Sequence, residues 1–265
     1  MKKLLKQIIK HKKTCYFISP HLDDAVFSTA GLISYLAKRT RVVVITVFTE
    51  AGNERHSLSG LSYLKQCGYE ASQVGEFYSD RRSEDKEAIE SIGAEVMHLS
   101  FIDALWRLNR KPNIVYKFLS YFLNDFRYIY PTFRWHIAKG KINKHDRRNL
   151  VDLRKQLMDI VGNEEQSVVF CPLGVGKHVD HVFTREACKD TFKNVVYWED
   201  FPYNLNHDTN IAFIDDNELE SLSFTKNQLL RKKAFPIYKT QFGKLFGGRE
   251  YSLPSEKYYM KGKNE

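Results

Sequence analysis

Two stretches of the sequence decide the fold: TCYFISPHLDD at residues 14–24 and VVFCPLGVGKHVDH at residues 168–181. Each begins with a short apolar run typical of a buried strand and ends in His and Asp side chains. A helical pattern follows each of them, at residues 25–33 and 178–187. Polar residues between a strand and a helix lie at the carboxyl end of the strand, where open α/β sheets bind their ligands. We therefore expect the two clusters to meet at one edge of a parallel sheet.

Three further apolar runs, at residues 42–48, 94–99 and 194–198, have the length and composition of strands. Helical patterns lie between several of them, and this alternation is typical of βαβ units. We therefore predict an α/β fold with a Rossmann-like, mostly parallel sheet flanked by helices. A single domain is expected to span residues 1–265.

The rest of the chain has weaker patterns. Residues from about 104 to 162 contain no clear strand, and we interpret them as an insertion near the active site, with helices at residues 114–126 and 147–161. Some of its side chains are expected to form a pocket wall: Trp106, Phe133, Arg134 and Trp135. The alternative is that the insertion forms an auxiliary helical layer or a dimer contact. Residues 224–238 are expected to form a C-terminal helix, and the polar tail from Ser255 is expected to fray.

The composition argues against several classes of protein. The formal net charge is +9, but the basic residues are dispersed and form no nucleic-acid recognition motif, so we expect no nucleic-acid partner. The four cysteines form no CxxC pair, which favours a reducing cytoplasm. Residues 1–13 are basic and amphipathic, and they contain no continuous apolar stretch long enough for a signal peptide or a membrane span. We therefore expect them to pack on the domain. The sequence leaves a homo-oligomer open.

A metal site is the chemistry that the two polar clusters predict. His21 and Asp24 are three residues apart across a strand-to-helix turn, so both side chains can point at one ion, and His181 is the third expected ligand. Two histidines and one aspartate are ligands of catalytic Zn²⁺ sites with an open position for water. Fe²⁺ is the alternative metal. Helix capping is the competing explanation for the paired aspartates, but it leaves His21 and the second cluster unexplained.

The remaining polar residues of the two clusters suggest catalytic roles. Asp23 could face the pocket without binding the metal and accept a proton from an activated water molecule. His178, when protonated, could stabilise an oxyanion or protonate a leaving amine, whereas the competing explanation is a surface histidine at a helix start. Asp180 is expected to orient a histidine from behind the ligands.

These motifs resemble those of a known enzyme family. His21-Leu22-Asp23-Asp24 resembles the His-Pro-Asp-Asp signature of the PIG-L (LmbE-like) zinc-dependent de-N-acetylases, and His178-Val179-Asp180-His181 resembles their His-x-Asp-His motif. The resemblance implies zinc on His21, Asp24 and His181, with Asp23 as general base and His178 assisting the oxyanion or the leaving group. Weaker matches follow the same order, and the resemblance implies sugar contacts from Arg81 and Asp103.

Three positions depart from the family pattern. Leu22 replaces a proline and Ala25 replaces a common glutamate, and neither change removes a ligand. Gly176 lies two residues before His178, where some members carry a tyrosine that assists the tetrahedral intermediate. That role is either absent here or supplied from elsewhere, and Tyr203 is the candidate.

The sequence thus predicts a zinc-dependent amidohydrolase that removes acetyl from an N-acetylated amino-sugar glycoside. We expect the substrate to be a small molecule, such as a natural-product or aminoglycoside-type intermediate of antibiotic biosynthesis. A bacillithiol-type thiol precursor is an alternative substrate. A non-catalytic nucleotide-binding module is the rival from another class, although the chain has neither a Gly-x-Gly-x-x-Gly nor a P-loop motif.

Overall fold

The computed structural model describes residues 1–52, 56–246 and 253–262. Within these ranges seven strands form one sheet in the order β3-β2-β1-β4-β5-β7-β6. The strands are β1 (Thr14–Ser19), β2 (Val42–Glu50), β3 (Glu95–Ile102), β4 (Ser167–Pro172), β5 (Val195–Trp198), β6 (Leu219–Phe224) and β7 (Glu256–Lys261). The first five strands of this order pair in parallel, so the predicted Rossmann-like, mostly parallel sheet is confirmed.

The last two strands were not predicted. β7 pairs antiparallel with both β5 and β6, so the tail expected to fray forms part of the sheet instead. Its two tyrosines explain why: Tyr258 is buried in the core on one face of the sheet, and Tyr259 is buried on the other. A polar-looking segment of six residues can therefore bury two aromatic rings because successive strand side chains point to opposite faces.

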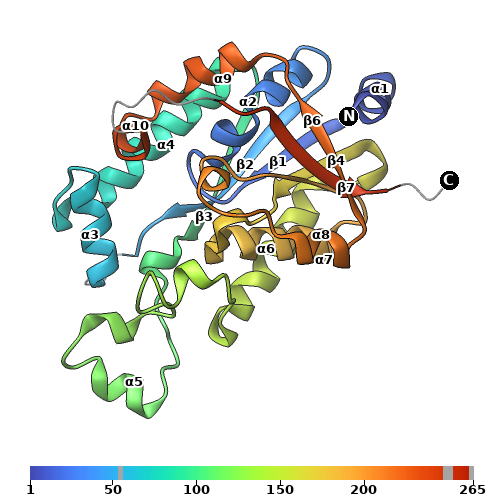
Figure 1. Ribbon diagram of the computed structural model, residues 1–265. Coiled ribbons are helices and arrows are strands. Elements are labelled where there is room, and N and C mark those ends of the chain that lie inside the picture. Colours follow the sequence, from blue (N-terminus) through green and yellow to red (C-terminus); the bar gives the residue numbers. More distant parts are fainter. Residues whose placement is uncertain (53–55, 247–252, 263–265) are drawn as a thin grey trace.

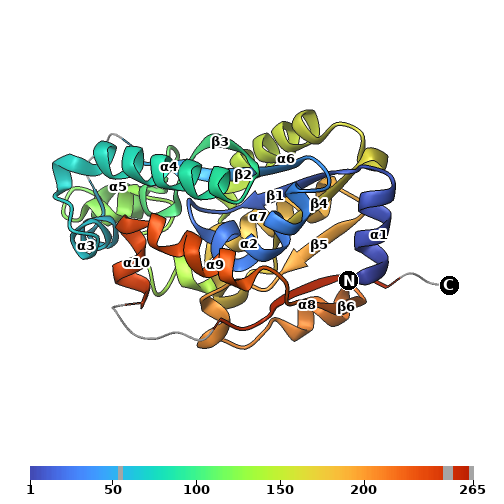
Figure 2. The same cartoon turned by 90° about the horizontal axis from the view of Figure 1, so that it is seen from above.

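Helices cover both faces of the sheet, as Figures 1 and 2 show. On one face lie α1 (Lys2–Lys10), α2 (Asp24–Ala37), α4 (Val74–Ser91) and α9 (Gln228–Ala234). On the other lie α6 (Arg147–Val161), α7 (Val179–Thr191) and α8 (Ile211–Asp216). The expectation that residues 1–13 pack on the domain is met by α1, whose Leu5 and Ile8 are buried in the core. In the described part of the chain, no helix has the length and apolarity needed to cross a membrane.

Three helices lie outside these two layers: α3 (Leu58–Gln66), α5 (Ile114–Leu119) and α10 (Lys239–Phe246). The segment expected as an insertion is mostly irregular up to residue 146 and then continues as α6, which packs on the sheet through Leu153, Leu157 and Val161. The C-terminal helix expected over residues 224–238 is shorter, because Phe224 ends β6 and Asn227 adopts a left-handed conformation before α9 begins. A 3₁₀ turn at Phe235–Ile237 follows α9.

The order in which successive strands are added to the sheet changes direction between β1 and β4, although these two strands are parallel. This point of the sheet positions the site. β1 pairs with β2 on one side and with β4 on the other. The helix after β1, α2, lies on one face of the sheet, whereas the helix after β4, α7, lies on the opposite face. Ligands of open α/β sheets bind in the crevice that such a divergence leaves at the carboxyl ends of the strands.

Candidate active site

Two short loops bring the polar clusters together. The first, Pro20–Asp23, joins β1 to α2, and the second joins β4 to α7 through Gly174 and Gly176. Both glycines have left-handed backbone conformations, with φ of +82° and +79°, which side chains on L-residues rarely permit. The Pro-Leu-Gly-Val-Gly sequence therefore allows the tight reversal that places His178 at the first residue before α7.

Asp24 lies between two histidines. Its Oδ2 atom is 3.1 Å from Nδ1 of His21 and 3.3 Å from Nε2 of His181. Two ligands of a tetrahedral Zn²⁺ ion lie about 3.3 Å apart, since zinc–nitrogen and zinc–oxygen bonds are about 2.0–2.1 Å long. All three side chains are buried. The separation of Asp24 from each histidine therefore suits neighbouring ligands of one ion.

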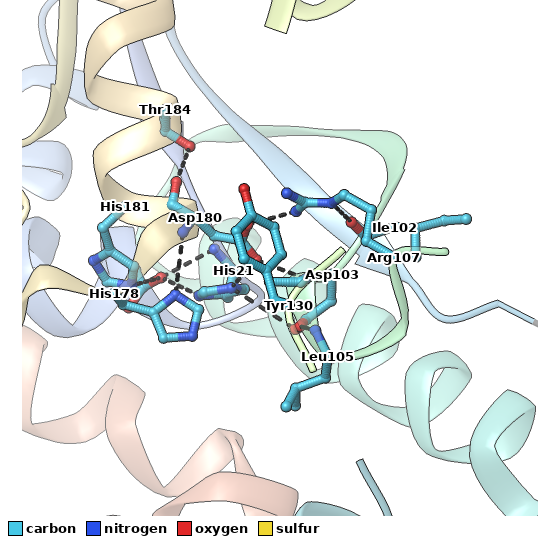
Figure 3. Close-up of polar contacts among 12 residues, drawn as sticks. His21, Ile102, Asp103, Leu105, Arg107, Tyr130, His178, Asp180, His181 and Thr184 are labelled. Carbon is cyan, nitrogen blue, oxygen red and sulfur yellow. Dashed lines mark hydrogen bonds and ion pairs between the residues drawn. The ribbon is translucent and has the colours of Figure 1, made fainter. Parts of the chain in front are cut away.

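A buried nitrogen that makes no hydrogen bond also fits a metal. Nε2 of His181 is completely buried, and although Oδ2 of Asp24 lies 3.3 Å away, the two atoms form no hydrogen bond, which costs free energy unless something binds the nitrogen. Two overlapping groups of buried side chains have donor atoms within 4.8 Å of one another: His21 with His178 and His181, and His21 with Asp103 and Asp180. The donor chemistry thus suits a divalent cation, and Figure 3 shows the three imidazoles converging.

Asp180 orients His21 from behind. Its Oδ2 is 3.2 Å from Nε2 of His21 and accepts a hydrogen bond from the backbone N–H of Ala104. Its Oδ1 accepts from the guanidinium of Arg107, which also donates to Asp146 (Figure 3 shows the contact with Asp180). Burial opposes the ionised form, but Arg107 and His21 lower the pKa of Asp180 below its ordinary value. Asp180 is therefore a carboxylate held in place by three donors.

Arg107 and Asp200 are site residues that sequence reasoning missed. Arg107 follows the β3 strand end without any motif, so nothing in the sequence marked it. Oδ1 of Asp200 accepts a hydrogen bond from Nδ1 of His181 at 2.7 Å, and its Oδ2 accepts from the backbone N–H groups of Gly174 and Val175. Asp200 could have been predicted, because a carboxylate two residues after a parallel strand also lies at a carboxyl end of the sheet.

Asp23 faces the cavity beside the three proposed ligands. Burial raises the pKa of Asp23 to about 6, and the guanidinium of Arg81 at 3.3 Å acts in the opposite direction. Arg81 is itself buried on α4, and its Nε atom has no hydrogen-bond partner among the described residues. A carboxylate whose pKa lies near neutrality can both accept a proton and return it.

His178 caps α7 and is neutral. Its Nδ1 accepts a hydrogen bond from the backbone N–H of Asp180 at 3.3 Å, so Nδ1 carries no proton. Burial and the neighbouring His21 lower the pKa of His178 well below its ordinary value. These surroundings favour a neutral imidazole with its proton on Nε2 over the protonated state considered from the sequence, and a neutral imidazole can donate a hydrogen bond but is a poor acid.

The site opens into a cavity of about 690 Å³. Two of the nine predicted site residues, Asp180 and His181, are fully buried beneath the cavity. The other seven line it: His21, Asp23, Asp24, Arg81, Asp103, His178 and Tyr203. The ring of Tyr203 packs against Gly176 and lies 5.0 Å from the ring of His181, centroid to centroid. The structure thus brings every predicted site residue into one place.

The insertion contributes to this cavity less than its aromatic residues suggested. Phe133 lines the cavity, with its ring 6.0 Å from that of His178. Trp106 is buried beneath the rim, where its Nε1 donates to His56. Trp135 lines a separate, smaller hollow instead. Of the four side chains expected in the wall, only Phe133 is in it, because the chain turns at residues 132–137 and points its neighbours away.

Comparisons with known proteins identify the family and the fold of the chain. The family model described as "PIG-L: GlcNAc-PI de-N-acetylase" matches residues 16–192, which is more than half of the chain. No curated protein sequence matches. Among solved structures, teicoplanin deacetylase Orf2 in its zinc-inhibited form has a TM-score of 0.75 and 19% identity, over 95% of this chain and 100% of that one.

Two other structures carry the same fold. The A40926 pseudoaglycone deacetylase Dbv21 has a TM-score of 0.65 and 19% identity, over 94% of this chain and 96% of that one. N,N'-diacetylchitobiose deacetylase from Pyrococcus horikoshii has a TM-score of 0.50 and 17% identity, over 93% of this chain and 80% of that one.

Proposed function

Because the chain belongs to the PIG-L family of GlcNAc-PI de-N-acetylases, we propose that it is a metal-dependent amidohydrolase. The reaction is removal of the acetyl group from an N-acetylated amino sugar, with acetate and a free amine as products. One observation carries the proposal: the Asp24 carboxylate lies 3.1 Å and 3.3 Å from two histidine nitrogens, with a second carboxylate, Asp23, facing the same cavity.

Zinc, or alternatively Fe²⁺, is the proposed metal, held by His21, Asp24 and His181. Such an ion, when bound, acidifies water and polarises the amide carbonyl. Asp180 and Asp200 hold the two histidine rings from behind, through contacts of 3.2 Å and 2.7 Å. Both carboxylates thereby fix which ring nitrogen faces the ion.

The remaining residues move the protons and stabilise charge. Asp23 accepts the proton of the attacking water and returns it to the departing nitrogen, a double role suited to its pKa of about 6. The Nε2–H of His178 donates to the oxygen that becomes negative in the tetrahedral intermediate. Tyr203 is a second donor, since its half-buried position raises its pKa well above the ordinary value and keeps the phenol protonated. Arg81 and Asp103 are the proposed sugar contacts.

The proposed substrate is an N-acetylglucosaminyl natural product, such as an intermediate of antibiotic biosynthesis. Three of the structural relatives are described as deacetylases of teicoplanin, of A40926 pseudoaglycone and of N,N'-diacetylchitobiose, which supports this class. The acidic side chains of the cavity also bear on the charge of the substrate. Its lining contains three carboxylates, Asp23, Asp24 and Asp103, each already engaged with protein groups. Among the residues that the structure describes, no further acid lines the wall, which favours a neutral or anionic glycoside over a polycationic aminoglycoside. No disulfide joins any of the four cysteines, all of which lie in the described part of the chain, and this supports the cytoplasm as the proposed compartment.

A substrate screen tests the proposal. The zinc-loaded protein is incubated with N-acetylglucosamine, N,N'-diacetylchitobiose and an N-acetylglucosaminyl glycopeptide, and released acetate is measured. We expect acetate from at least one glycoside, loss of this activity after chelation, and recovery on addition of Zn²⁺ or Fe²⁺. Acetate release that survives complete metal removal would contradict metal dependence, and no release from any substrate would contradict the proposed reaction.

A further inference from the structure

A projecting arm of the chain exposes an unusual amount of apolar surface. We define the arm as residues 108–128, which include α5 and the 3₁₀ turn Asn124–Arg127. Six large apolar or aromatic residues within ten positions are 50–84% exposed: Ile114, Val115, Phe118, Tyr121, Phe122 and Leu123. Scattered apolar residues on a surface are ordinary, but a contiguous group of this kind marks an interaction site.

Contacts within the arm give it a defined structure. A β-bridge between Leu108 and Tyr128 closes its root, and the backbone N–H of Asn109 donates to the carbonyl of Arg127 at 2.8 Å. Within the arm the ring of Tyr116 packs against that of Phe126, with centroids 5.4 Å apart. The rings of Phe118 and Phe122 pack together at the same distance on the exposed side. The exposed aromatic group is therefore held in a fixed arrangement.

The exposed charged side chains of the arm are all cationic. Arg110, Lys111 and Lys117 are exposed and have no carboxylate partner among the described residues, and residues 108–124 contain no Asp or Glu. The first acid of the arm, Asp125, is buried and accepts a hydrogen bond from the backbone N–H of Leu58. Apolar and aromatic side chains bordered by Lys and Arg are the composition of segments that lie in the interface of anionic membranes.

The root of the arm lies close to the active-site cavity. Leu58, to which Asp125 anchors the arm, lines that cavity and is 64% exposed. Figures 1 and 2 both place α5 at the end of the molecule where α3 lies, away from α1 and from the two chain ends. A surface that bound the arm would therefore contact the end of the molecule where α3 contributes to the cavity lining.

We propose that the arm docks the protein on an anionic lipid surface, with the ring pair of Phe118 and Phe122 entering the interface and the exposed cations Arg110, Lys111 and Lys117 binding lipid headgroups. A second copy of the chain is a poorer occupant, because the net charge of +9 would be brought against itself and Lys is depleted from protein interfaces. This docking is independent of the proposed deacetylation, since it concerns surface residues outside the catalytic cavity.

Vesicle co-sedimentation tests the docking without any enzymatic readout. The metal-loaded, full-length protein is mixed with vesicles of phosphatidylcholine alone, or of phosphatidylcholine with about 30% phosphatidylglycerol. The first variant carries Phe118→Ser and Phe122→Ser, with Leu229→Ser and Ile211→Ser as its control, because these residues are 77% and 65% exposed on α9 and α8. The second carries Glu at the exposed cations Arg110, Lys111 and Lys117, and its control carries Glu at Lys2, Lys3 and Lys6 on α1, so that the net charge is identical.

We expect the wild-type protein to bind the anionic vesicles, and more strongly than the neutral ones. Both arm variants should bind about tenfold or more weakly, whereas both controls should stay close to wild type. Unchanged thermal midpoints confirm that these exposed substitutions leave the fold intact. Failure of the wild type to bind anionic vesicles would overturn the proposal. So would equal losses in arm and control variants, unaltered binding by the serine variant, or a wild-type dimer that the serine variant converts to a monomer.

Discussion

The ring of Tyr203 occupies the space that a side chain at position 176 would need. A Cβ atom built on Gly176 would lie 2.6 Å from Cδ1 of Tyr203, well inside contact distance. A glycine at position 176 therefore makes room for a tyrosine that comes from the loop after β5. This complementarity explains how one polar group at the site can be supplied from a different segment of the chain.

Tyr203→Phe removes the hydroxyl and keeps the ring that packs on Gly176. We expect kcat to fall about 100-fold, the usual cost of removing one donor to an oxyanion, while zinc content and thermal midpoint stay unchanged. Steady-state kinetics with measured metal content checks this. Tyr35→Phe, on the outer part of α2, serves as the control and should leave kcat at the wild-type value. A Tyr203→Phe variant with normal kcat would exclude the hydroxyl from the reaction.

Asp200→Asn weakens the support of His181. The substitution keeps an acceptor for the backbone N–H groups of the β4–α7 loop but removes the charge 2.7 Å from Nδ1 of His181. We expect zinc affinity to fall about 10–100-fold, as is usual when the partner of a ligating histidine is changed. Competition with a chelating dye measures the affinity. The exposed Asp216→Asn is the matched control, and equal affinities in both variants would show that Asp200 does not orient a ligand.

Arg107→Met leaves two buried carboxylates, Asp180 and Asp146, without their shared cation. Breaking such a buried network should lower the free energy of unfolding by about 3–5 kcal/mol. Arg41→Met is the control, because its ion pair with Glu95 is exposed and should contribute no more than about 1 kcal/mol. Urea denaturation of the metal-free proteins measures both. Similar losses in the two variants would mean that the buried contacts of Arg107 add nothing to stability.

Glu256 makes stability depend on pH. Burial raises the pKa of Glu256 from 4.5 to about 7, so the folded protein retains this proton to higher pH than the unfolded chain. Its contribution is complete below pH 4.5 and is lost as pH rises through about 7, at a cost of roughly 3 kcal/mol. Relative to Glu256→Gln, the wild type should therefore lose unfolding free energy between pH 5 and 8. Parallel curves for the two proteins over this range would contradict the prediction.

The sequence predicted the parts of the molecule that depend on local patterns. Continuous apolar runs marked the five parallel strands, because a strand buried on both faces has few polar residues. The His and Asp clusters were placed correctly because both follow such runs. β7 was missed because its residues Glu256 and Lys257 look polar, and only the folded sheet shows that Glu256 is buried beside the backbone of α2.

The supporting contacts of the site could not be predicted for a similar reason. Arg107 reaches Asp180 across 73 residues, and Asp200 reaches His181 from the neighbouring strand. Such pairs depend on which strands are adjacent in the sheet, and the order of strands is a long-range property that no motif carries. The protonation of His178 also depends on a tertiary detail, since its cap on α7 decides which nitrogen holds the proton.

The division of labour between neighbouring aspartates is the central claim, and Asp23→Asn tests it most directly. The measurement is acetate released per mole of bound zinc, with Asp24→Ala studied in parallel. We predict that Asp23→Asn keeps the wild-type amount of zinc and releases acetate at least about 100-fold more slowly, because an amide cannot accept the proton of water. Asp24→Ala should instead lose most of its zinc. Near-normal acetate release from zinc-loaded Asp23→Asn protein would contradict the assignment of Asp23 as the base.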